Sequence, residues 1–128
     1  MVSFLVVHSS YDTKLSEAGV RRTLALGGVG IEQLDRLAAT SELPNVTVRV
    51  LPFEAGVHRS MSGSFTVLDF AEGVSPPIAY QEYAVGGHLV DDQDVVQQLS
   101  DLHDQLREQA LGCDESMAML SSLTQQAR

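Results

Sequence analysis

The sequence predicts an α+β fold: a mostly antiparallel sheet of about four to five strands, with helices packed on one face and two helices at the C-terminus. Strand-like apolar patterns dominate the chain up to residue 90, whereas apolar residues recur at helical spacing after it. The chain has 128 residues, of which 44% are apolar. This length and composition fit one domain over residues 1–128.

The first part of the chain predicts one strand and one helix. Residues 3–8 are almost continuously apolar, as in a central strand. Residues 9–28 hold no single period and receive no assignment. A helix is expected from about residue 30 to 41, after the glycines of residues 27–30, and it ends before Pro44. Its apolar face is formed by Ile31, Leu34, Leu37 and Ala38.

The middle of the chain predicts four further strands or short strand segments. Residues 46–50 alternate strictly, which places Thr47 on the wetter face together with Arg49. Residues 64–70, 78–83 and 88–90 follow, and turn-rich or glycine-rich links separate them. These short links favour an antiparallel meander of the last three strands.

The C-terminal part predicts two helices. Asp91 or Asp92 caps the first, and Gly112 ends it as a C-cap glycine. Apolar residues at helical spacing form its inner stripe, and His103 is expected at the flank of that stripe. The stripe consists of Val95, Leu99, Leu102, Leu106 and Ala110. The second helix is expected over residues 114–126.

Charge and composition exclude several functions. The net charge is -9, with 8 basic against 17 acidic residues, so direct binding to nucleic acid is not expected. No apolar run is long enough for a membrane span. The single Cys113 suits a cytoplasmic protein. The histidines show no metal-ligand spacing, and no motif for a cofactor is present.

Residues 43–58 and 61–70 carry a family resemblance, which continues through residues 76–82 and Gly86-Gly87. The chain resembles the domain of unknown function that forms the C-terminal part of bacterial helix-turn-helix regulators of the XRE type, which are common beside secondary-metabolite pathways. The likeness covers residues 29–125 well, whereas residues 1–28 match loosely. It implies an effector-sensing domain for a small molecule or a partner.

Two features depart from that family. Its domain normally follows a DNA-binding part, whereas this chain starts at Met1 without one, so a stand-alone form is expected. The family often has proline-glycine after the histidine of the long link, where this chain has Arg59-Ser60. Ligand specificity is expected to differ at that position.

The link between the strands at 46–50 and 64–70 supplies the first candidate site. It contains His58, Arg59, Ser62 and Ser64. Long links on a rigid scaffold often bind ligands, and an imidazole titrates near neutral pH. A polar ligand pocket is one interpretation. The alternative is that His58 caps a turn and the serines bond to the loop backbone.

A second candidate lies on the strand at 78–83. Tyr80 and Glu82 share one face because side chains alternate along a strand. If that face is the inner one, Glu82 is a buried carboxylate of the kind that marks functional sites. If it is the outer face, Glu82 is solvated and Tyr80 lies beside it. His8 ends the first strand and is expected near the same end of the sheet, with a structural role as the alternative.

These residues favour a regulatory module that binds a small molecule or a partner between the sheet and the helices, with residues 52–64 as a gate. The alternative is a cofactor-independent enzyme of natural-product biosynthesis, an isomerase or cyclase with His58 or Glu82 as its acid–base residue. A third possibility is a partner that pairs with regulator proteins. A homodimer is also possible.

Overall fold

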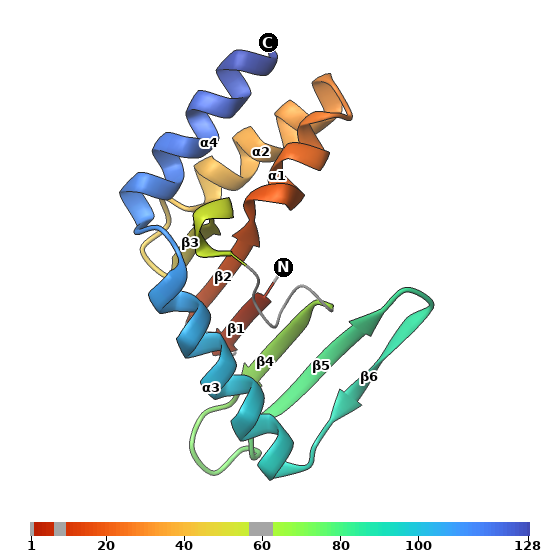
Figure 1. Ribbon diagram of the computed structural model, residues 1–128. Coiled ribbons are helices and arrows are strands. Elements are labelled where there is room, and N and C mark those ends of the chain that lie inside the picture. The colour runs from red at the N-terminus through yellow and green to blue at the C-terminus, as the bar shows by residue number, and fades with distance from the viewer. Residues whose placement is uncertain (1, 7–9, 57–62) are drawn as a thin grey trace.

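The computed structural model describes residues 2–6, 10–56 and 63–128. Within this part of the chain, six strands form one sheet in the order β3-β2-β1-β4-β5-β6 (Figure 1). The strands are β1 (Val2–Val6), β2 (Ser10–Ser16), β3 (Val46–Leu51), β4 (Phe65–Asp69), β5 (Ile78–Tyr83) and β6 (Gly86–Val90). The helices are α1 (Glu17–Leu24), α2 (Gly28–Thr40), α3 (Gln93–Gln109) and α4 (Cys113–Ala127), with the short 3-10 turn η1 (Phe53–Ala55) after β3. The predicted α+β class is confirmed.

The sheet is mixed, and its two halves have different connections. β4, β5 and β6 form the predicted antiparallel meander, and β1 is antiparallel to β2. β1 pairs parallel with β4, and β2 pairs parallel with β3. Parallel neighbours need a crossover connection, and α1 and α2 supply the one between β2 and β3.

The unassigned segment at residues 9–28 contains both β2 and α1. The alternation of β2 was not recognised because two charged residues, Asp12 and Lys14, occupy positions on one of its faces. The following helix begins at a serine cap: the side chain of Ser16 accepts a hydrogen bond from the backbone nitrogen of Gly19 at 3.0 Å. Only eight residues long, α1 is too short for a clear apolar period.

The glycines at residues 27–30 serve the turn between α1 and α2, as expected. Gly27 has a φ of 68° at the N-cap of α2, a conformation that favours glycine. Gly30 lets the two helices approach closely, because a Cβ atom there would lie 1.8 Å from the carbonyl oxygen of Thr23. The tight helix pair therefore depends on a missing side chain.

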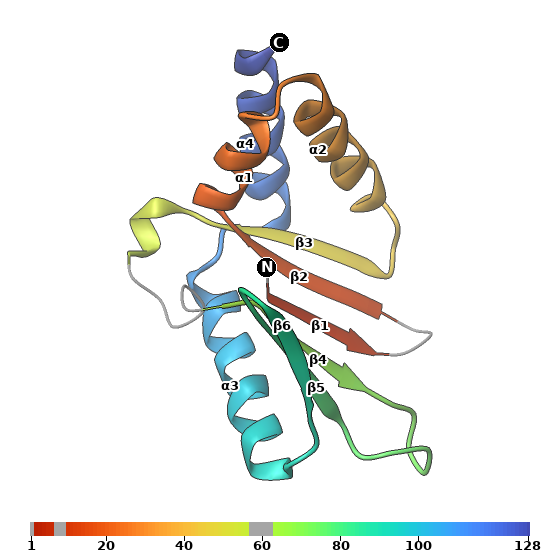
Figure 2. The same ribbon diagram turned by 90° about the vertical axis from the view of Figure 1, so that its right-hand side faces the viewer.

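Helix α3 packs along one face of the sheet and completes the main core (Figures 1 and 2). Asp92 is its N-cap, and its side chain accepts hydrogen bonds from the backbone of Asp94 and Val95. The expectation for Gly112 is wrong. Ala110 ends α3, while Gly112, with a φ of −62°, precedes α4 instead. The buried residues of this core are Leu51, Phe65, Val67, Ala79, Val90, Val96, Leu99 and Leu106.

A second core joins α1, α2 and α4 beyond the β3 end of the sheet (Figure 2). Helix α4 also covers the outer edge of β3. The backbone nitrogen of Val50 donates to the hydroxyl of Ser116 at 2.9 Å, and the carbonyl of Val50 accepts from Leu111 at 2.9 Å. This edge is therefore closed to further strands. The buried residues of the second core are Val20, Leu34, Val50, Leu120 and Leu123.

Candidate functional site

Three predicted site residues lie together on the face of the sheet that turns away from α3. Phe65 and Val67 point into the α3 core, so Ser64 lies on the opposite face of the sheet. Ser64 lies opposite Glu82, whose backbone nitrogen donates to the Ser64 carbonyl at 3.0 Å. Tyr80 is two residues from Glu82 and shares its face. We call this surface, formed by Ser64, Thr66, Tyr80, Glu82 and Leu89, the open face.

No helix of the described chain covers the open face (Figures 1 and 2). Tyr80 is half-buried, Glu82 is exposed, and Leu89 is 66% exposed. Of the two alternatives for this strand, the outer face is therefore the observed one. Glu82 is a solvated carboxylate, and the described site residues do not lie between the sheet and α3.

The ring of Tyr80 lies across the neighbouring edge strand. A Cβ atom built on Gly87 would stand 2.6 Å from the Tyr80 hydroxyl oxygen and 2.5 Å from the carbonyl of Gln81. Only a glycine leaves room for the ring there. The pairing of Tyr80 with Leu89 places an apolar side chain beside it on the same face. The open face thus combines an aromatic surface, an apolar side chain and one carboxylate.

Four other predicted residues lie outside the described residues: His8, His58, Arg59 and Ser62. The long link is described at both of its ends. Its last residues, from Gly63 onward, lead into the open face through Ser64. Its first residues are held by α1, which the sequence did not predict.

Glu17 anchors the start of the long link. Its carboxylate accepts hydrogen bonds from the backbone nitrogen of Phe53 at 3.0 Å and from Nε of Arg21 at 2.8 Å. The Arg21 guanidinium also lies 5.6 Å from the centre of the Phe53 ring. Burial alone would raise the pKa of Glu17, but the hydrogen bonds from Phe53 and Arg21 lower it overall. The link therefore leaves the sheet from a fixed, charged anchor.

A buried polar network joins β2 to α3, and the sequence did not predict it. Lys14 and His103 are both completely buried, and their side chains meet at 2.8 Å between Nζ and Nε2. Nζ also donates to Oδ1 of Asp12 at 2.9 Å. Oδ2 of Asp12 accepts from Arg107 on α3 at 3.2 Å. We call Asp12, Lys14, His103 and Arg107 the buried network.

The charges of the buried network follow from burial and proximity. Burial lowers the pKa of Lys14, and Asp12 partly offsets this decrease. The guanidinium groups of Arg107 and Arg49 lower the pKa of Lys14 further. Burial also lowers the pKa of His103, as does the Lys14 ammonium. A neutral His103 accepts the Lys14 hydrogen bond at Nε2, which places its own proton on Nδ1. The network then consists of one ammonium, one carboxylate, one guanidinium and one neutral imidazole.

The expectation for His103 is wrong because this residue occupies the centre of the inner stripe, not its flank. Val96, Leu99, His103 and Leu106 are the buried residues of α3. Their separations of three and four residues were readable in the sequence. A second sequence feature that could have indicated the buried network is the single lysine of the chain, which lies two residues from an aspartate in β2. Complete burial leaves Lys14 and His103 without contact to solvent, so the network holds α3 on the sheet and does not present reactive groups.

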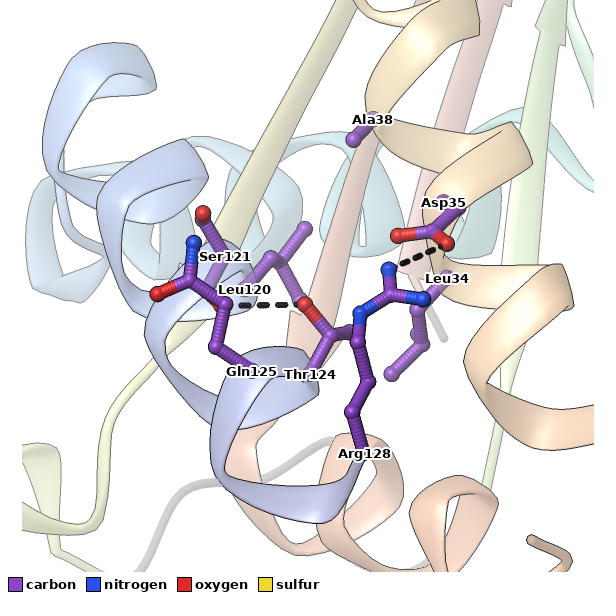
Figure 3. Close-up of a pocket in the computed structure, with 8 residues that line it drawn as sticks. All are labelled: Leu34, Asp35, Ala38, Leu120, Ser121, Thr124, Gln125 and Arg128. Carbon is purple, nitrogen blue, oxygen red and sulfur yellow. Dashed lines mark hydrogen bonds and ion pairs between the residues drawn. The ribbon is translucent and has the colours of Figure 1, made fainter. Parts of the chain in front are cut away.

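A small cavity lies between α2 and α4, and Figure 3 shows its lining residues. Arg128 reaches across it to Asp35, with Nη2 2.6 Å from Oδ2. The cavity volume is about 180 Å³, which is below the usual size of ligand sites. The described members of the predicted site, Ser64, Tyr80 and Glu82, do not line it. Leu34, Ala38, Leu120, Ser121, Thr124 and Gln125 complete the lining.

Two further observations bear on function. Among the described residues, no three His, Cys, Asp or Glu side chains are arranged to hold a metal ion. None of the helices in the described ranges has the length and apolar character needed to span a membrane.

Comparison with known proteins gives one match. No curated protein matches the chain, and no solved structure does. Residues 8–122 match the family model described as a domain of unknown function (DUF5753). The matched segment starts after β1, runs into α4, and includes the open face and the buried network. The chain therefore belongs to the DUF5753 family.

Proposed function

We propose that this domain is a regulatory binding module that takes a neutral or cationic small molecule on its open face. The observation that carries the proposal is the meeting of Ser64, Tyr80 and Glu82 on one face of the sheet, which none of the described helices covers. These residues come from two strands and were predicted separately as ligand contacts. The long link leads directly into this surface.

The chemistry of the open face favours certain ligands. Tyr80 offers a half-buried ring on which a planar or cationic group can stack. Glu82 adds a carboxylate, and the strands β4, β5 and β6 contain no Lys or Arg to balance it. A ligand with a negative charge would meet unfavourable electrostatics there. A planar group that is neutral or positively charged fits best.

The family supports a regulatory role. The chain resembles the C-terminal, effector-sensing part of XRE-type regulators. A net charge of -9 favours recognition of a molecule other than nucleic acid. In this proposal the domain would pass its signal on through a partner protein.

The enzymatic alternative has less support. Acid–base catalysis needs groups that can be screened from bulk water with the substrate. Glu82 lies on an open surface, and the perturbed groups Lys14 and His103 are completely buried under α3. Binding without chemistry is therefore the preferred function.

Ligand-observed NMR with three fragment sets tests the proposal: aromatic ammonium compounds, neutral aromatics and aromatic carboxylates. The ammonium and neutral sets should bind, and Tyr80→Leu should abolish their binding. Glu82→Gln should weaken the ammonium set about fivefold, as expected for loss of an exposed ion pair worth ~1 kcal/mol. Glu72→Gln is the matched control, because Glu72 is an exposed acid in the link between β4 and β5.

Two results would contradict the proposal. One is preferential binding of the carboxylate set. The other is fragment binding that Tyr80→Leu leaves unchanged. If the parent protein converts pathway intermediates and Glu82→Ala does not, the enzymatic alternative is supported instead.

A further inference from the structure

One edge of the sheet is blocked by other parts of the fold, and the other edge is exposed. The β3 edge is blocked at Val50, whose two backbone groups bond to Ser116 of α4 and to Leu111 in the link between α3 and α4. The β6 edge lies at the other end of the sheet (Figure 1). Within the described ranges, β6 pairs with β5 alone, and its outer backbone groups meet no other strand or helix.

Proteins usually protect such an edge with a lysine, a proline, a bulge or a covering segment. β6 has the sequence Gly-Gly-His-Leu-Val, which contains neither lysine nor proline. Its register with β5 runs without a bulge from Gly86 to Val90. The first four residues of β6 are exposed, and Leu89 is 66% exposed. The edge is therefore available for another strand.

Exposed apolar residues surround this edge. Tyr83 is 57% exposed and Val85 is 98% exposed, both at the tip of the β5–β6 hairpin. Figure 1 shows the hairpin extending away from the helices. Together with Leu89, these residues offer apolar contacts on and around the edge strand. An exposed group of large apolar residues is typical of interaction surfaces.

The charges near β6 select the partner. The segment from residue 63 to 106, which contains β4, β5, β6 and most of α3, has no Lys or Arg. Its acidic residues are Asp69, Glu72, Glu82, Asp91, Asp92, Asp94, Asp101 and Asp104. A second copy would bring two acidic surfaces together, which opposes self-association. A basic partner has the complementary charge.

We propose that β6 is a docking edge for an extended segment of another protein in which Lys or Arg alternates with apolar residues. Its backbone continues the sheet by pairing with β6, as in other cases of strand addition. Its Lys or Arg side chains lie on the face of Leu89, where they approach Glu82 and Asp91 near the two ends of β6. Its apolar side chains lie on the other face, which is the face of Tyr83. This edge adjoins the proposed ligand contacts on the open face and gives the domain a protein partner.

Binding of seven-residue peptide pools tests the docking edge. In the first pool, Val, Ile, Thr or Tyr alternates with Lys or Arg; in the second, Glu or Asp replaces the basic residues. Fluorescence anisotropy should show that the basic pool binds at least about tenfold more tightly than the acidic pool. The same basic pool with a methyl group on every backbone nitrogen should lose binding, because it has no donors for the ladder.

A matched pair of variants locates the binding surface. Leu89→Lys places a positive charge on the edge and should weaken the basic pool at least about tenfold. Leu26→Lys makes the same change at a residue that is 67% exposed in the turn between α1 and α2, and it should leave binding unchanged. Circular dichroism of both variants checks that the fold is retained.

Four results would overturn the docking edge: no binding of the basic pool at ~1 mM, equal binding of the acidic pool, binding that survives backbone methylation, or equal losses in the two variants. Sedimentation that shows a dimer dissociated by Leu89→Lys would instead assign the edge to a second copy. Fragment binding to the open face is measured separately. If the parent protein binds the fragments but not the basic peptides, the docking edge is overturned and the proposed ligand site is not.

Discussion

The buried network allows a prediction with a defined upper limit: Asp12→Ala should destabilise the fold by about 3–5 kcal/mol at pH 7. The substitution removes the carboxylate that pairs with the Lys14 ammonium at 2.9 Å. Lys14 is completely buried, so the substitution removes the charged partner of a buried ammonium. The ammonium is then left with the neutral His103 as its partner.

The upper limit is set by the free energy that the buried Lys14 ammonium needs to release its proton. If Lys14 releases its proton, the cost is about 1.36 kcal/mol for each pH unit below its ordinary pKa of 10.5. At pH 7 this gives at most about 5 kcal/mol. Loss of the bond from Arg107 adds at most about 1 kcal/mol, because that side chain is 45% exposed.

The pH dependence of Asp12→Ala has a definite sign. Burial lowers the pKa of Lys14 in the folded protein, and removal of Asp12 lowers it further. Between that lowered pKa and 10.5, the unfolded chain binds more protons than the folded chain, so stability rises with pH. Asp12→Ala should therefore recover up to about 3 kcal/mol, relative to the parent protein, between pH 7 and pH 9.

Urea denaturation followed by circular dichroism, at pH 7 and pH 9, measures these differences. Lys14→Met removes the buried charge, and Asp12 keeps its bond to Arg107. This variant should therefore lose only about 1–3 kcal/mol, from the contact between Lys14 and His103 Nε2. The double variant should be more stable than Asp12→Ala alone. Asp35→Ala, which removes an exposed ion pair with Arg128, is the control and should cost about 1 kcal/mol or less. A double variant that loses the sum of both single effects, or no recovery at pH 9, would refute the reasoning.

Three further predictions concern other parts of the fold. Burial and Lys14 lower the pKa of His103, so below the ordinary histidine pKa of 6.5 this residue binds a proton in the unfolded chain before it does so in the folded chain. As the pH falls from 6.5 to 5, this group should therefore lower the free energy of unfolding by at most about 2 kcal/mol. His103→Gln should reduce this dependence on pH in denaturation curves. Ser116→Ala should cost about 1–3 kcal/mol and speed hydrogen exchange at Val50, whose backbone nitrogen loses its acceptor; unchanged exchange would contradict the proposed closing of the β3 edge. Gly30→Ala should lower the free energy of unfolding by at least about 1–3 kcal/mol. The added Cβ would lie 1.8 Å from the Thr23 carbonyl oxygen, so α1 and α2 would have to move apart. An unchanged thermal midpoint would show that the two helices can move apart without a loss of stability.

Some parts of the fold were readable because local patterns decided them. The alternation of residues 78–83 predicted the meander that β5 and β6 form, although the glycines at 86–87 begin β6 and do not separate it from β5. The acid before α3 predicted its cap, and the structure assigns that cap to Asp92. In each case the signal lies within a few neighbouring residues. Local sequence is then sufficient.

Other parts were not readable because their pattern depends on distant partners. β2 carries Asp12 and Lys14 on the face toward α3, and these charged side chains are stable there only because His103 and Arg107 meet them from α3. A buried polar residue does not follow the apolar period that identifies a strand or a helix face. The same cause placed His103 at the flank of the predicted stripe instead of at its centre.

The sequence by itself determined the α+β class, the meander, the N-cap of α3 and the shared face of Tyr80 and Glu82, because alternation along a strand fixes which side chains share a face. Only the tertiary structure decided which of the two faces α3 covers, and hence that Tyr80 and Glu82 point outward. It also decided that the single lysine lies buried against a histidine 89 positions away. The physical reason is that burial depends on what packs against a residue from elsewhere in the chain, and the spacing of neighbouring residues contains no information about that packing.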